Sequence, residues 1–151
     1  PSNAIKDPNN LLMQQADGTF QEMGQSAGLA STERGRGAAL VDFDGDGRLD
    51  VLVLNRRAPL QIYRNETPDA GHWLAVSLMQ RGGNRHAIGA SVTVNGDMQR
   101  AIIGGGHAGG QASPLHFGLG DATQAEITVE WPSGQITHHT ATADQIVTLS
   151  P

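Results

Sequence analysis

The most informative stretch of the sequence is Asp42-Phe43-Asp44-Gly45-Asp46-Gly47-Arg48-Leu49-Asp50. Three aspartates alternate, a glycine follows them, and a fourth aspartate closes the run. A hard cation such as Ca²⁺ takes six to eight oxygen ligands, and alternating carboxylates on a tight loop can converge on one point. Gly47 permits a backbone turn that a Cβ would obstruct. The stretch therefore predicts a Ca²⁺ site whose ligands are the side chains of Asp42, Asp44, Asp46 and Asp50 and the backbone carbonyl of Arg48.

The loop differs from an EF-hand in two respects. Its first six positions fit the EF-hand pattern, but Val53 stands at the twelfth position, where a bidentate Glu is required. Both flanks are also expected to be strands, so Asp50 must close a loop inside a β-hairpin. The competing interpretation is a solvated acidic turn, because Asp and Gly are common turn residues. The numerous protein ligands favour Ca²⁺ over Mg²⁺.

Extended segments surround the loop. Residues 51–54 are apolar at every position, which is typical of a strand covered on both faces. Turn signals separate the other apolar runs at a spacing of about ten residues, which favours a sandwich or barrel. Residues 21–30 alone carry a weak helical pattern, enough for a turn or two. The expected strands are 10–15, 19–23, 37–43, 49–54, 60–65, 73–78, 90–95, 100–103, 115–119, 125–131, 136–139 and 146–149.

Composition limits the possible functions. The chain has 151 residues, 20 glycines, six aromatic residues and no cysteine, which favours short strands and turns and excludes disulfides and thiolate metal sites. The formal net charge is -5 and no basic run is present, so we expect no nucleic-acid partner. No apolar run is long enough to span a membrane. The N-terminus lacks the features of a signal peptide, and residues 2–4 resemble a cloning scar.

Two resemblances extend this interpretation. Residues 37–51, together with Asp17-Gly18-Thr19-Phe20, resemble the FG-GAP or VCBS repeat of integrin-like β-propellers, in which the loop between two blade strands holds Ca²⁺. The second half resembles the ASPIC/UnbV domain that follows such repeats in cartilage acidic protein-like proteins. The segments that carry this second resemblance are 72–76, 84–90, 104–106, 116–120 and 131–134. Residues 107–111 depart from the Tyr-Leu-Ser-Gln run that many members of this family have after the triple glycine.

The resemblances imply an all-β chain with two parts. Residues 1–66 are expected to form about one blade of a β-propeller-like repeat with the calcium loop, and residues 67–151 a β-sandwich or barrel-like ASPIC/UnbV domain. Residues 66–71, which include Pro68, are the expected linker. Since a propeller needs at least four blades, we expect the chain to be a fragment of a longer secreted protein, the alternative being that the single blade packs on the second domain or on another copy. We also expect self-association through exposed blade edges.

The expected function is binding without catalysis. The first hypothesis is a calcium-stabilised extracellular recognition or adhesion module, secreted or periplasmic, that binds an unidentified protein or glycan. The second is an accessory domain of a larger secreted enzyme, with carbohydrate binding as a further alternative. Extracellular Ca²⁺ modules have dissociation constants near about 10⁻⁴–10⁻³ M, which suits a compartment rich in calcium.

Other candidate residues have simpler interpretations. Adjacent His138 and His139 point to opposite faces of a strand and do not easily share one ion, so structural hydrogen bonds are expected for the histidines. Trp73 and Trp131 suit a core better than a sugar platform. Residues 104–106 favour a sharp backbone bend over a phosphate loop, because neither a lysine nor a helix follows at the required spacing. Ser113 and Ser133 lack the surroundings of a hydrolase nucleophile.

Overall fold

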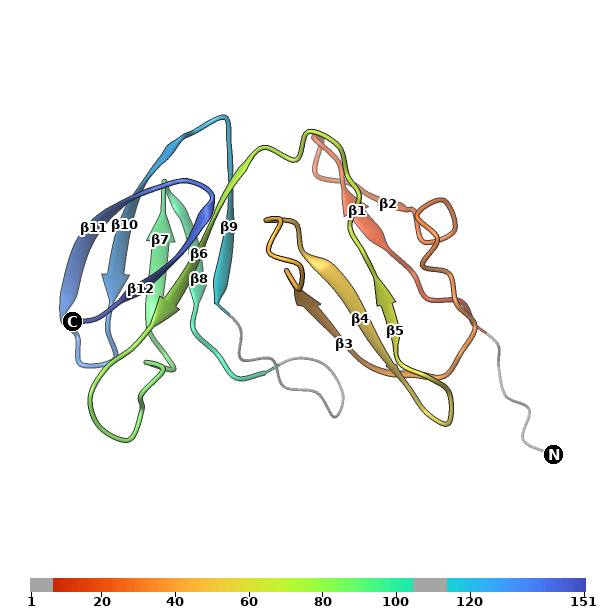
Figure 1. The fold of residues 1–151 in the computed structure, drawn as a ribbon, viewed down its shortest axis with the longest axis horizontal. Coiled ribbons are helices and arrows are strands. Elements are labelled where there is room, and N and C mark those ends of the chain that lie inside the picture. Colours follow the sequence, from red (N-terminus) through yellow and green to blue (C-terminus); the bar gives the residue numbers. More distant parts are fainter. Residues whose placement is uncertain (1–6, 105–113) are drawn as a thin grey trace.

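The computed structural model describes residues 7–104 and 114–151, and its elements are all strands (Figure 1). The first half contains β1 (Leu12–Gln14), β2 (Phe20–Glu22), β3 (Gly35–Val41), β4 (Asp50–Asn55) and β5 (Gln61–Tyr63). The second half contains β6 (His72–Leu78), β7 (Ser91–Val94), β8 (Asp97–Arg100), β9 (Leu115–Gly120), β10 (Gln124–Glu130), β11 (Ile136–Thr142) and β12 (Gln145–Leu149). The prediction of an all-β chain is confirmed.

The first half consists of two small antiparallel sheets, β1-β2 and β3-β4-β5. The turn between β1 and β2 is closed by Asp17, whose carboxylate accepts hydrogen bonds from the backbone N–H and the hydroxyl of Thr19. Gly18 follows with a φ of 84°, which is easily accessible only to glycine. The acidic stretch joins β3 to β4, and Val41 pairs with Asp50 at its base. The predicted calcium loop thus lies at the end of a β-hairpin.

Few side chains of the first half are buried. Among its described residues Val53 is the one buried hydrophobic side chain, at 7% exposure. The exposed large hydrophobic residues there are Leu12, Met13, Phe20, Leu40, Phe43, Leu54, Leu60 and Ile62. A sheet with apolar side chains exposed on this scale is typical of a repeat that packs against neighbours. This surface agrees with the expected self-association, which stays a prediction.

The second half is a sandwich of two sheets, β11-β10-β7-β8 and β12-β6-β9, in which β12 and β6 are parallel. Alternate side chains of β6 and β10, including Leu74, Val76, Ile127 and Val129, meet in one core together with Trp131. Period-two alternation places these residues on the inner faces and leaves the others outside. Neither sheet closes, so the sandwich form of the prediction applies.

Two local predictions differ from the structure. Residues 21–30 contain no helix: Gln21 and Glu22 belong to β2, residues 24–28 form turns, and the N–H of Ala27 donates to the Met23 carbonyl in a single helix-like turn. The strand expected at 100–103 instead lies at Asp97–Arg100. Asn95 and Gly96 both have positive φ and close a two-residue hairpin, which sets the register from Val94 opposite Asp97. The Asn95-Gly96 turn therefore determined where this strand lies, and the apolar residues 101–103 did not.

The division of the chain near residue 67 stays a prediction. It falls between the end of β5 at Tyr63 and the start of β6 at His72. Residues 1–6 and 105–113 lie outside the described residues. The expectations for residues 2–4, for most of the triple glycine, and for His107 and Ser113 therefore have no structural counterpart here.

Candidate metal site

The acidic loop is folded by hydrogen bonds from its own backbone to Asp42. Oδ1 of Asp42 accepts from the N–H groups of Gly45 and Asp46, at 2.8 and 3.0 Å, and Oδ2 accepts from the N–H of Gly47 at 2.9 Å. Gly45 and Gly47 have φ values of 77° and 87°, which bend the chain around the carboxylate. A carboxylate offers about four lone-pair positions, so these three bonds leave about one for a cation.

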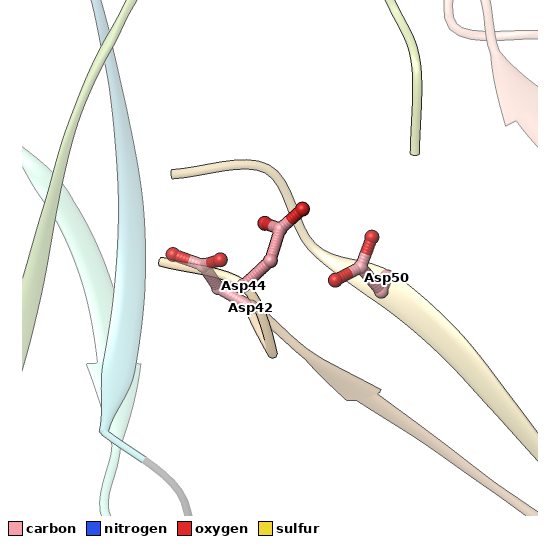
Figure 2. A group of neighbouring side chains, drawn as sticks. All are labelled: Asp42, Asp44 and Asp50. Carbon is pink, nitrogen blue, oxygen red and sulfur yellow. The ribbon is translucent and has the colours of Figure 1, made fainter. Parts of the chain in front are cut away.

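Three of the four predicted carboxylates converge. Oxygen atoms of Asp42, Asp44 and Asp50 lie within 4.8 Å of one another, and Figure 2 shows the three side chains grouped between the loop and the start of β4. Two ligands on opposite sides of one Ca²⁺ ion, each at about 2.4 Å, are about 4.8 Å apart. The three side chains therefore fit around a single calcium ion, with backbone carbonyls and water available for the remaining positions.

Asp50 is the most deeply buried of these acids, with 0% exposure. Its Oδ1 accepts from the N–H of Asn65 at 2.8 Å and its Oδ2 from the N–H of Phe43 at 3.1 Å. Within residues 7–104 and 114–151, no Lys, Arg or His forms an ion pair with it. A buried charge without a counter-charge costs several kcal/mol. A divalent cation beside Asp42 and Asp44 would supply that counter-charge.

Asp46 has a different environment. Its Oδ1 accepts from the backbone N–H of Arg48 at 2.9 Å, and its Oδ2 forms ion pairs with the side chains of Arg48 and Arg64. Arg64 also pairs with Asp44 at 2.8 Å. The backbone bond from Arg48 and the two guanidinium charges lower the pKa of Asp46, while the charge of Asp44 and the hydrogen bond to Asp46 raise the pKa of Arg64. As ligands, Asp46 and the Arg48 carbonyl stay predictions.

Asn65 lies just after β5 and supports the acidic loop through hydrogen bonds. Besides its N–H bond to Asp50, its side-chain amide donates to the carbonyl of Leu49 at 3.2 Å. Its own carbonyl accepts from Nε of Arg48 at 2.7 Å. Asn65 and Arg64 were not predicted from sequence because both lie 14 or more positions beyond the loop, and only the pairing of β4 with β5 brings them to it.

The loop also touches the second half of the chain, at Gly47. A Cβ on Gly47 would lie 2.0 Å from Nε1 of Trp73, so the indole ring occupies the space beside this α-carbon. The Gly47 carbonyl accepts a hydrogen bond from Nε2 of His116 at 2.8 Å. The rings of Trp73 and His116 are stacked, with centroids 5.7 Å apart and planes 5° apart. Gly47 therefore has a packing role as well as a conformational one.

The remaining candidates have structural surroundings. His138 hydrogen-bonds the hydroxyl of Thr128 and His139 that of Thr137, while His72 pairs with Asp144. Trp131 is 2% exposed in the sandwich core, and its Nε1 donates to the Thr137 hydroxyl, so it offers no sugar platform. Among the residues that the structure describes, the acidic loop is the one cluster with the arrangement of a metal site.

Two family models match parts of the chain. Residues 3–53 match the family model of the FG-GAP-like repeat, and residues 80–151 match the family model described as ASPIC and UnbV. These two matches confirm the two resemblances and together cover most of the chain. The acidic loop lies wholly inside the first match, and His116 lies inside the second. Arg64, Asn65 and Trp73 fall between the two matches.

Three relatives match most of the chain. The chain is 29% identical to mouse cartilage acidic protein 1 over 144 residues, which cover 90% of this chain and 22% of the relative. It is 31% identical to the human protein over 134 residues, which cover 83% of this chain and 20% of the relative. It is 32% identical to the Xenopus tropicalis protein over 129 residues, which cover 80% of this chain and 20% of the relative. The chain thus spans about a fifth of the length of these relatives. Its described part has no helix with the length and hydropathy of a membrane span.

Proposed function

We propose that the chain is a calcium-binding recognition module in which the metal has a structural role. The observation that carries the proposal is Asp50, a fully buried carboxylate beside Asp42 and Asp44 whose described partners are backbone N–H groups. A cation at this point compensates the buried charge and joins the two strands of the hairpin. The ion has no role as an activator of water, and the proposal includes no catalysis.

The proposed setting is extracellular. Calcium modules of modest affinity are saturated only where calcium is abundant. The three relatives are named after cartilage, which supports a secreted location for this chain as well. The proposed ligand is an extracellular protein or glycan. The exposed apolar side chains of the first half, such as Phe20 and Ile62, are a proposed contact surface for further repeats or for a second copy.

Calcium titration tests the proposal directly. We expect calorimetry to show one site with a dissociation constant near about 10⁻⁴–10⁻³ M. A ligand at a hundredfold excess over its dissociation constant stabilises the folded state by about 2.7 kcal/mol, so calcium should raise the melting temperature by about 5–10 °C relative to chelator. Equal melting temperatures in the two conditions would refute a structural metal.

Asp44→Ala is the variant best suited to this titration. Asp44 is exposed and its described bonds are to the N–H of Asp46 and to Arg64, so its removal deletes a metal ligand with little cost to folding. We expect it to lose most calcium binding while melting like the parent chain in chelator. Asp97→Ala removes an exposed acid from β8 and is the matched control, with calcium binding unchanged.

Arg64 makes a further prediction about affinity. Its guanidinium pairs with Asp44 and Asp46 and therefore competes with a cation for the same negative charge. Arg64→Gln should bind calcium about twofold more tightly at low ionic strength, and the gain should shrink with added salt because exposed charges are screened. Titrations at two salt concentrations measure both effects. An unchanged or weaker affinity would show that Arg64 does not oppose metal binding.

A further inference from the structure

One face of the β6–β9 sheet is directed away from the sandwich core. Leu74, Val76 and Phe117 point into the core. In the ladder between these strands, Trp73 pairs with Gly118 and Ala75 pairs with His116. Residues paired across a ladder, and those two positions apart along a strand, share a face. Trp73 and His116 therefore stand together on the outer face, where both contact Gly47 of the acidic loop. In Figure 1 the loop between β3 and β4 lies on the side of the first half that faces β9.

Hydrogen bonds with other residues of the second half restrain both Trp73 and His116. The N–H of Trp73 donates to Oδ1 of Asp144 at 3.3 Å, and its carbonyl accepts from the N–H of Asp144 at 2.7 Å. The carbonyl of His116 accepts from the side-chain amide of Gln99 at 2.6 Å. The stack of the two rings adds a third constraint. The outer face thus presents a fixed indole edge and a fixed imidazole N–H to the loop.

These two groups hold the part of the loop that orients its carboxylates. Because a carbonyl only accepts, Nε2 of His116 carries the proton of the bond to Gly47. A peptide group is planar, so a bond at the Gly47 oxygen also fixes the N–H of Arg48, which donates to Asp46. The Gly47 N–H donates to Asp42. The contacts of Trp73 and His116 with Gly47 therefore affect the orientation of two predicted ligands, Asp42 and Asp46.

We propose that Trp73 and His116 are positioning residues for the calcium loop, so that the second half of the chain sets the metal affinity of the first. The inference rests on the proposed calcium function. Its physical basis is preorganisation: a loop already held in the ligand geometry loses less conformational freedom when the ion binds. By linkage, calcium stabilises the contact between the two halves as much as that contact favours calcium.

The test is calcium titration of the full chain carrying His116→Ala. Hydrogen-bonding groups behind metal ligands typically contribute at least tenfold to affinity, so we expect the dissociation constant to rise about tenfold. His116→Gln restores a side-chain N–H donor and should recover most of that loss, which a merely structural defect would not show. His138→Ala, on β11 and bonded to Thr128, is the matched histidine control and should bind like the parent chain.

The outcomes separate this inference from the proposed function. Unchanged affinity in both His116→Ala and Trp73→Ala, with binding lost in Asp44→Ala, would overturn the positioning role and leave the calcium site intact. Equal weakening in His116→Ala and His116→Gln would also overturn it, provided that circular dichroism shows both variants folded. Absence of calcium binding by the parent chain would overturn the proposed function, and the inference with it.

Discussion

The Asp50→Ala variant is expected to unfold with a free energy about 2–5 kcal/mol lower than that of the parent chain. Asp50 is fully buried and accepts hydrogen bonds from the N–H groups of Phe43 and Asn65. Removing the carboxylate leaves two part-buried donors without acceptors, and each such loss costs about 1–3 kcal/mol. In chelator, removal of the uncompensated charge offsets part of that sum. Urea denaturation in chelator measures this cost without any contribution from metal.

Asp50→Asn provides the control. The amide has nearly the same shape, but only its oxygen can accept, so it keeps one of the two hydrogen bonds and turns an N–H toward the other donor. We expect a stability between those of the parent chain and Asp50→Ala. Both variants should also lose most of the stabilisation that calcium confers. A loss below about 0.5 kcal/mol in Asp50→Ala would contradict the role assigned to this residue.

Gly47→Ala is expected to cost about 3 kcal/mol, well above the effect of the same change at Gly45. Both glycines have positive φ, which costs a residue with a Cβ about 1–2 kcal/mol. At Gly45 the added Cβ meets nothing within 4 Å, whereas at Gly47 it would lie 2.0 Å from the Trp73 ring. Overpacking of this kind adds about 1–3 kcal/mol. Urea denaturation of Gly45→Ala measures the cost of backbone strain alone. The same measurement on Gly47→Ala gives the cost of backbone strain together with the steric clash against Trp73.

A double-mutant cycle isolates the collision. In a Trp73→Ala background the ring is absent, so Gly47→Ala should cost only about as much as Gly45→Ala does. Trp131 remains in the core as the fluorescent probe of unfolding. If Gly47→Ala costs the same with and without Trp73, the contact between the loop and β6 carries no stability, and the positioning role of Trp73 fails with it.

Much of the fold was predictable because its signals are local. The strands expected at residues 90–95 and 125–131 are present as β7 and β10, because apolar runs and the turn signals between them act within a few residues. The error at residues 100–103 arose where two local signals competed. Apolar Ile102 and Ile103 suggested a strand, but the two-residue turn had already fixed the pairing of β8 with β7.

Local sequence is enough to predict the acidic loop, its position between two strands and ligand types suited to calcium, because alternation and turn chemistry operate over neighbouring residues. Which acids come together, and what holds them, depends on long-range contacts. Asp46 turns to Arg64, Asp50 is capped by Asn65, and Gly47 is held by Trp73 and His116. These contacts span 15 to 69 positions along the chain, and only strand register and the packing of the two halves create them.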